Sequence, residues 1–278
     1  MHRLVCGLGI LFFCCMASAQ AADVEFPDEQ LDTVIREILK KKQIDKLDKA
    51  KTITEEDVST IFFLEAPKRG IMKLNGLEKC KNLALVRLTE NQIEDVSPLA
   101  ECLNIQSLDL AKNKIQDIAP LAKLVKLQYL QLEDNQIGKI DAVQELKALN
   151  ALYLSRNQIE SLGPVNGLPK LAAVYLEKNK IADITAVASL KWLERLDLNG
   201  NQVKDITPLA GLTELRWTFL QNNQLTEVGT LVEMAKKDLE TSKRFAPYWN
   251  VYLEGNPLND AGKQQVEELK KLGVRVHP

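Results

Sequence analysis

The sequence predicts an α/β solenoid, in which short parallel strands line one side of a stack of coils and tight turns close the other. Three observations support this prediction. An asparagine recurs every 22 residues between positions 91 and 223, an alternating apolar segment precedes each asparagine, and apolar residues follow it at two fixed distances. A fixed period of this length is typical of repeat proteins, in which each coil buries its apolar face against its neighbours.

The residues before each asparagine predict a strand. In the first full repeat Val86 and Leu88 stand five and three residues before Asn91, and this spacing of two puts both side chains on one buried face. The asparagine lies where the chain leaves the strand, and its amide can bond backbone groups that the turn leaves unpaired. We therefore expect a structural ladder of asparagines: Asn91, Asn113, Asn135, Asn157, Asn179, Asn201, Asn223 and Asn256.

The residues after each asparagine predict short convex turns. Prolines at positions 98, 120, 164 and 208 stop a long helix there, which favours 3₁₀ turns. Aspartates at positions 95, 117, 183 and 205 lead into these turns, where we expect them to accept local backbone N–H groups. Between Asn223 and Asn256 the spacing grows to 33 residues. The added residues have helical spacing, so we expect an inserted helix near 230–244, either a packed structural insert or a contact element.

The N-terminus predicts export. Arg3 precedes an apolar run from Leu4 to Met16, and residues 17–19 (Ala-Ser-Ala) offer a cleavage site, with cleavage after Ala21 as the alternative. This run is shorter than the ~20 residues that span a bilayer. We therefore expect a cleaved signal peptide at 1–19, a secreted or periplasmic protein, and no transmembrane segment in the mature chain.

The repeat and the segment before it resemble a known family. The repeat that starts at Asn113 reads N-x-I-x-D-I-x-P-L-A-x-L, which resembles the repeats of bacterial internalin-type leucine-rich repeat proteins. Residues 26–28 (Phe-Pro-Asp) and the apolar stripe that follows look like the helical N-terminal cap of that family. The resemblance implies a right-handed leucine-rich repeat horseshoe with a parallel concave sheet, convex 3₁₀ turns and helical N- and C-caps. We divide the chain into an N-terminal cap at 20–68, repeats at 69–257, and a C-terminal cap helix and strand at 258–278.

The residue inventory speaks against catalysis. After removal of the signal peptide one histidine remains, His277, near a C-terminus that we expect to fray. The sequence has no nucleophile–histidine–carboxylate set, no zinc-type spacing and no phosphate loop. We therefore predict a protein that is not an enzyme, with no cofactor and no metal. Cys80 and Cys102 occupy equivalent inward positions in adjacent repeats, either as two core residues or as a disulfide.

The concave face is the candidate binding surface. Its outward positions lie two, four and six residues before each asparagine, and they carry six aromatic side chains. Exposed aromatic residues dominate the energetics of protein interfaces, although ordinary strand propensity also favours them. The candidate partner-binding residues are Tyr129, Tyr153, Tyr175, Arg195, Asp197, Trp217, Phe219 and Tyr252.

These observations predict an exported, non-catalytic binding module that recognises a protein ligand through this face. The alternative is an envelope carbohydrate-binding protein that uses the same aromatic residues to stack on sugar rings. The net charge of −2 argues against a nucleic-acid partner, which needs a basic surface. We expect a monomer.

Overall fold

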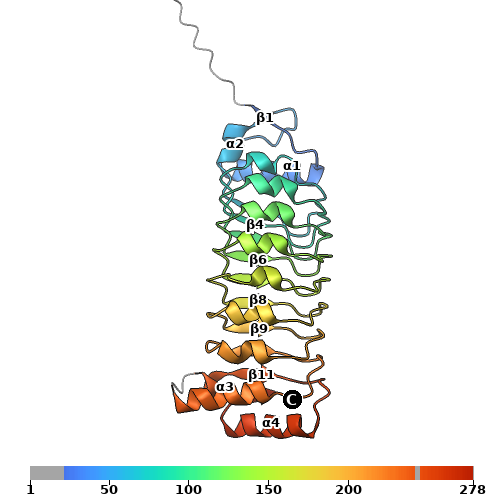
Figure 1. Cartoon of the computed structure of the whole chain (residues 1–278). Helices are drawn as coiled ribbons and strands as arrows, with labels where there is room; N and C mark the ends of the chain where they lie inside the picture. Colours follow the sequence, from blue (N-terminus) through green and yellow to red (C-terminus); the bar gives the residue numbers. More distant parts are fainter. Residues whose placement is uncertain (1–21, 242–244, 278) are drawn as a thin grey trace, which may run out of the picture.

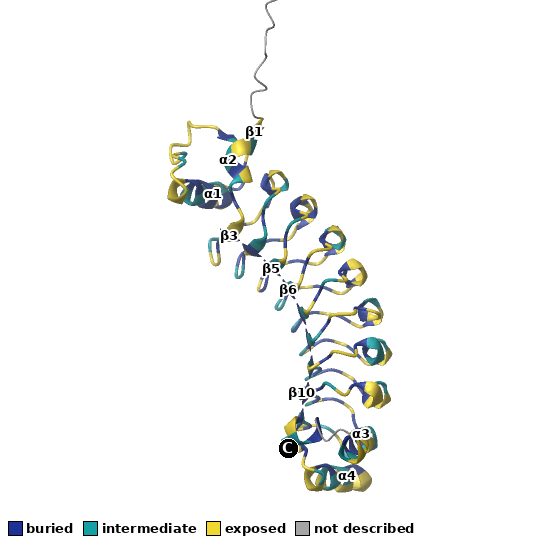
Figure 2. Ribbon diagram, turned by 90° about the vertical axis from the view of Figure 1, so that its left-hand side faces the viewer, coloured by how far each residue is buried: buried dark blue, intermediate teal, exposed yellow. Residues whose placement is uncertain are grey.

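The computed structural model describes residues 22–241 and 245–277. The predicted signal peptide at 1–19 and the last part of the predicted inserted helix, 242–244, lie outside the described residues. The described chain forms a curved stack of coils (Figure 1). Parallel strands lie on the inner side of the curve and 3₁₀ turns on the outer side (Figure 2), which confirms the predicted leucine-rich repeat solenoid.

The concave sheet has ten strands in sequence order, and every neighbouring pair is parallel. Each strand is three residues long, because the L-x-L segment is short and the turn at the asparagine ends it. The strands are β3 (Phe63–Glu65), β4 (Leu85–Arg87), β5 (Ser107–Asp109), β6 (Tyr129–Gln131), β7 (Ala151–Tyr153), β8 (Ala173–Tyr175), β9 (Arg195–Asp197), β10 (Trp217–Phe219), β11 (Asn250–Tyr252) and β12 (Arg275–His277).

The convex side consists of the predicted 3₁₀ turns. Those in the repeats are η1 (Leu77–Lys79), η2 (Ser97–Glu101), η3 (Ala119–Lys123), η4 (Asp141–Glu145), η5 (Gly163–Val165), η6 (Thr185–Ser189) and η7 (Thr207–Gly211), and η8 (Ala246–Tyr248) precedes β11. The aspartates that lead into them accept backbone N–H groups two residues on, as expected; Asp95 bonds the amide of Ser97 at 2.8 Å.

The asparagine side chains join neighbouring coils. The Asn157 amide nitrogen donates to the carbonyls of Leu132 and Leu154 at 2.9 and 3.0 Å, and its oxygen accepts the Ile137 amide at 3.0 Å. Asn157 is buried, so these three bonds satisfy backbone groups that water does not reach. Each asparagine from Asn91 to Asn223 makes the same three kinds of bond.

The N-terminal cap consists of β1 (Asp23–Val24) paired antiparallel with β2 (Ile53–Thr54), α1 (Glu29–Lys41) and α2 (Glu55–Ser59). Asp28 caps α1 and also accepts the amides of Met72 and Lys73 at 2.7 and 2.9 Å, which fastens the helix to the first coil. Burial opposes ionisation of Asp28, but the four backbone donors around it hold the pKa of that carboxyl below its ordinary value. The first strand of the sheet, β3, falls within the segment 20–68 that we assigned to the cap.

The C-terminal end departs from the 22-residue coil. The inserted residues form α3 (Gly229–Glu240), and α4 (Asp260–Lys271) packs against it. α3 ends at Glu240, before the predicted end near 244. Beyond it, an Asp238 carboxylate oxygen accepts the amides of Phe245 and Ala246. The buried Trp249 indole donates to the Thr218 hydroxyl at 2.8 Å. Thr218 stands five residues before Asn223, an inward position at which the other repeats carry Val or Leu.

The two cysteines are free, buried core residues, so the structure does not contain the disulfide considered as an alternative. The Cys102 sulfur lies 3.0 Å from the Leu77 carbonyl oxygen, which places the thiol as a donor to backbone. Burial raises the pKa of the Cys102 thiol to about 12 and raises the pKa of Cys80 as well. Both thiols are therefore protonated and unreactive in the core.

Candidate functional site: the concave aromatic strip

The strand register brings the six candidate aromatic residues into adjacent positions on the concave face. The central run pairs Tyr153 with Tyr175, Tyr175 with Asp197, and Asp197 with Phe219 across successive strands. We call the set Tyr129, Tyr153, Tyr175, Trp217, Phe219 and Tyr252 the aromatic strip. Parallel strands lie ~4.8 Å apart, so rings at the same strand position are close enough to stack.

The tyrosines at the middle of the strip contact one another directly. The Tyr153 and Tyr175 rings are stacked, with centroids 4.5 Å apart and planes 9° apart. Tyr129 lies against Tyr153 at 5.1 Å in a tilted arrangement. Its hydroxyl donates to Gln131, and burial raises the pKa of Tyr129 to about 12.

Arg195 joins the middle of the strip to its C-terminal part. Its guanidinium donates to the Tyr175 hydroxyl at 2.7 Å and lies 4.2 Å from the centre of the Trp217 ring. The second contact is a cation–π interaction between the guanidinium and the indole. The predicted residues Arg195 and Trp217 are therefore one unit.

The strip ends on a histidine. Phe219 stacks on Tyr252 at 4.6 Å, and Tyr252 stacks on His277 at 4.2 Å. His277 lies in β12, paired with Tyr252 across the sheet, so the expectation of a frayed position was wrong. The cause is tertiary: α4 returns the chain to the sheet edge, where β12 adds the last strand.

The eight predicted partner-binding residues are half-buried rather than fully exposed. The alternation places their side chains on the outward face, as predicted, but neighbouring rings and Arg195 cover much of each. The surface offered to a partner therefore consists largely of ring edges, hydroxyls and guanidinium groups.

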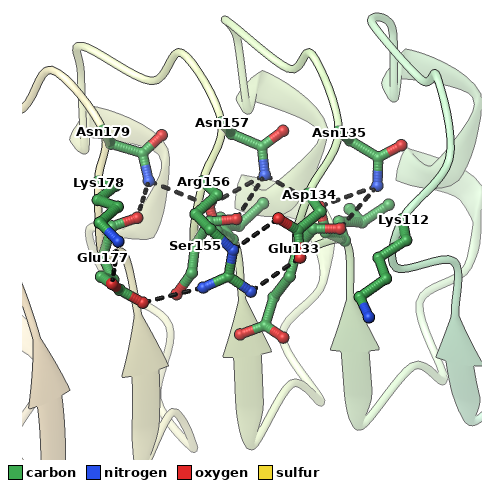
Figure 3. A network of polar contacts seen from close by, with 12 residues as sticks. Lys112, Glu133, Asp134, Asn135, Ser155, Arg156, Asn157, Glu177, Lys178 and Asn179 are labelled. Atoms are coloured by element: carbon green, nitrogen blue, oxygen red, sulfur yellow. Dashed lines mark hydrogen bonds and ion pairs between the residues drawn. The ribbon is translucent and has the colours of Figure 1, made fainter.

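A charged network borders the strip on the side of the asparagine ladder (Figure 3). Arg156 forms a bidentate pair with Asp134 at 2.6 and 2.8 Å and reaches Glu177 at 2.9 Å. The hydrogen bond from Arg156 holds the pKa of Asp134 below its ordinary value. This network ties three successive coils together, since its members come from the ends of β6, β7 and β8.

Two carboxylates near the network have raised pKa values. Burial, opposed by the Asn199 amide and supported by Glu177 and Glu133, raises the pKa of Asp197 to about 6. Burial also raises the pKa of Glu133. Burial therefore disfavours the charged form of both carboxylates in the middle of the concave face.

Sequence reasoning missed three exposed or terminal aromatic groups on this side of the molecule. Phe63, 63% exposed, lies on β3, six residues before Arg69, which replaces the asparagine of the first repeat. Tyr248, 57% exposed, precedes β11, and His277 extends the strip. The 22-residue spacing counted back from Arg69 is a signal for Phe63; no sequence signal places Tyr248 or His277.

Within the described residues, no group of three or more histidine, cysteine or acidic side chains is arranged to hold a metal ion. Over the same residues no helix combines the length and apolar character that crossing a membrane requires.

Comparison with known proteins agrees with the architecture. A family profile described as "Leucine Rich repeats (2 copies)" matches residues 103–146 and 172–211. Internalin C2 of Listeria monocytogenes is 29% identical, with a TM-score of 0.69 over 75% of this chain and 90% of that one. A leucine-rich repeat protein of Leptospira interrogans is 26% identical, with a TM-score of 0.63 over 77% of this chain and 52% of that one. The functional domain of internalin J of Listeria monocytogenes, at 20% identity and a TM-score of 0.61 over 90% and 56%, shares the fold. No curated protein matches the chain.

The repeats, the parallel concave sheet and the asparagine ladder define a leucine-rich repeat protein. More particularly, the chain, with its 22-residue repeat and helical N-terminal cap, is similar in sequence and fold to internalin C2 and is thus an internalin-like leucine-rich repeat protein. This fold suggests a protein-interaction module. What such a module binds depends on the residues of its site and not on the fold.

Proposed function

We propose that the chain is an exported, non-catalytic binding protein that holds a protein ligand on the aromatic strip. The observation that carries the proposal is a pair of runs of contacting side chains across β6–β12. They are Tyr129–Tyr153–Tyr175–Arg195–Trp217 and Phe219–Tyr252–His277. Such a run is rigid, because each side chain is held by the next, so little conformational entropy is lost on binding. Tyrosine, tryptophan and arginine are also the residues that dominate interface hot spots.

The stacking geometry favours a protein ligand over a carbohydrate. A sugar ring binds to the open face of an aromatic ring, whereas Tyr153 stacks on Tyr175 and also contacts Tyr129, so the tyrosines at the middle of the strip cover one another. The hydroxyls, ring edges and guanidinium group that are left suit the mixed polar and apolar surface of a protein.

Export and the division into cap, repeats and cap are further parts of the proposal. The apolar N-terminal run and the cleavage site at residues 17–19 support a signal peptide. The cap helices at each end support the division, because the terminal coils of a solenoid need a cover for their apolar faces.

Affinity capture tests the proposal. Residues 20–278 are immobilised and exposed to cell-envelope and extracellular extracts, alongside a variant with Tyr153→Ala, Tyr175→Ala and Trp217→Ala. The matched control is Trp192→Ala, which removes an aromatic side chain that is 64% exposed and lies outside the sheet.

We expect a protein retained by the wild type and by the control but lost from the triple variant, with the triple variant still folded by circular dichroism. Equal retention by all three proteins would show that the strip is not the binding face. Release of the captured protein by a soluble oligosaccharide would favour the carbohydrate reading.

A further inference from the structure

An open depression with a volume of about 490 Å³ lies beside the C-terminal end of the aromatic strip. Its volume falls within the ~300–1,000 Å³ typical of small-ligand sites. It is lined by Glu194, Arg216, Trp217, Tyr248, Asn250 and Arg275, and we call it the C-terminal concave pocket.

The sheet register builds this pocket from four successive coils. Trp217, Asn250 and Arg275 are the first residues of β10, β11 and β12 and pair across the sheet. The amides of Arg216 and Trp217 both bond the carbonyl of Glu194, which fixes the coil before β10. The floor of the pocket is therefore rigid backbone.

The walls combine flat rings with guanidinium groups. The Arg216 guanidinium lies 5.7 Å from the centre of the Tyr248 ring, and Arg195 covers Trp217 from the neighbouring strand at 4.2 Å. Trp217 and Tyr248 thus form an aromatic cleft beside positive charge, on a chain whose overall net charge is −2.

Two donors in the pocket are open to a ligand. Among the described residues, neither the Arg275 guanidinium nor the Trp217 indole N–H has a hydrogen-bond or ion-pair partner. The Asn250 amide group, in contrast, is engaged with the carbonyls of Arg216 and Tyr248. Arg275 is exposed, so its charge can turn toward a ligand at little cost.

The formal charge of the lining favours an anion. Two guanidinium groups and the Glu194 carboxylate leave one net positive charge in the lining. Arginine pairs bidentately with carboxylates and phosphates, but a phosphate carries about −1.5 to −2 and Glu194 would repel it more strongly.

We propose that the C-terminal concave pocket binds a carboxylate side chain of an acidic peptide segment, with an adjacent aromatic residue lying between Trp217 and Tyr248. This inference rests on the proposed function, because it takes the segment to belong to the protein ligand. It adds that the ligand presents a glutamate or aspartate at the C-terminal end of the strip.

Titration with blocked tetrapeptides tests the pocket without the natural ligand. One probe carries phenylalanine next to glutamate, and the other carries phenylalanine next to glutamine. Binding to residues 20–278 is followed by NMR of the three tryptophan indole N–H groups, and Trp217→Phe assigns the Trp217 signal. Trp192 and the buried Trp249 serve as internal references.

We expect the glutamate peptide to shift the Trp217 signal with a millimolar Kd and to spare the two reference signals. The glutamine peptide should bind at least about tenfold more weakly, and Arg275→Gln should weaken the glutamate peptide by a similar factor. Tyr248→Ala should also weaken it, whereas Arg87→Gln, an exposed arginine on the same face but outside the pocket, should leave it unchanged.

Equal binding of the two peptides, or no shift of the Trp217 signal at about 10 mM peptide, overturns the proposal. Stronger binding of glucuronate than of the glutamate peptide overturns the assignment to a protein segment. If the peptide binds but no protein is captured, the peptide site in the pocket stands and the proposed function is rejected. If a protein is captured equally well by the Arg275→Gln variant, the proposed function stands and the peptide site is rejected.

Discussion

The N-terminal strands and the middle strands of the concave sheet share one backbone but carry different chemistry. In strands β3–β5 the outward column holds charges, and Arg87 lies 3.1 Å from Glu65 and 3.9 Å from Asp109. In strands β7 and β8 the same column holds Tyr153 and Tyr175, stacked at 4.5 Å. Both arrangements follow from the same strand spacing.

The difference shows that the repeat fixes the distance between side chains on neighbouring strands, while the identity of the outward residues determines how those side chains interact. Charged neighbours at this spacing form exposed ion pairs, which contribute little because water screens them. Aromatic neighbours cover one another and exclude water, so they form a stiffer surface. We therefore expect a partner to bind at the aromatic strip.

The largest effect is expected from a test of whether the backbone beneath the charged strands and that beneath the aromatic strands are equally stable. Asn113→Ala and Asn179→Ala each remove three buried hydrogen bonds. We expect each to lower the free energy of unfolding by about 3 kcal/mol, because buried backbone groups lose their partners. Urea denaturation measures both losses. A difference of more than about 1 kcal/mol between them would show that the backbone is not equivalent in the two regions.

A second test uses two aspartates at the same strand position. Asp197 and Asp109 each accept the amide two residues on, but burial raises the pKa of Asp197 to about 6 from an ordinary 3.8. A raised folded-state pKa means that the stability gained from protonation is complete below pH 3.8 and is lost as the pH rises through about 6.

Asp197→Asn should therefore stabilise the protein by about 1 to 2 kcal/mol at pH 7 and have little effect at pH 3.5. Asp109→Asn should not stabilise it at pH 7, because it loses the attraction of Arg87. Thermal unfolding across this pH range compares them, and equal behaviour of the two variants would contradict the expectation that burial disfavours the charged form of Asp197.

A third test isolates the tyrosine stack. In a double-mutant cycle with Tyr153→Leu and Tyr175→Leu, we expect a coupling energy of about 1 kcal/mol, which is typical of aromatic pairs. Leucine preserves apolar contact, so the cycle reports the ring–ring interaction. A coupling near zero by chemical denaturation would mean that the rings only lie side by side.

The smallest effect is expected at the charged end. Arg87→Ala should change the free energy of unfolding by no more than about 0.5 kcal/mol, because Arg87 and its nearer partner Glu65 are both exposed to water. The small loss should shrink further in high salt. Denaturation at low and high ionic strength checks this, and a large salt-independent loss would show that Arg87 packs rather than pairs.

The sequence by itself determined the coil. Its period predicted three things: strands β4–β11, apart from their exact ends, the asparagine ladder, and the outward positions. All three depend on local alternation repeated at a fixed distance. Spacing also proved a better guide than proline. Ala142 and Thr230 both replace the convex proline, yet the first lies in a 3₁₀ turn within a 22-residue coil and the second begins a helix within a 33-residue one.

The tertiary structure decided everything that depends on contacts between coils. Ring stacking made the predicted aromatic residues half-buried, and the chain's return through α4 placed His277 on Tyr252. The same return brought Arg275 beside Trp217 and Tyr248, from segments with no shared sequence pattern. Such neighbours are set by how the ends of the solenoid pack, and a period in the sequence carries no information about them.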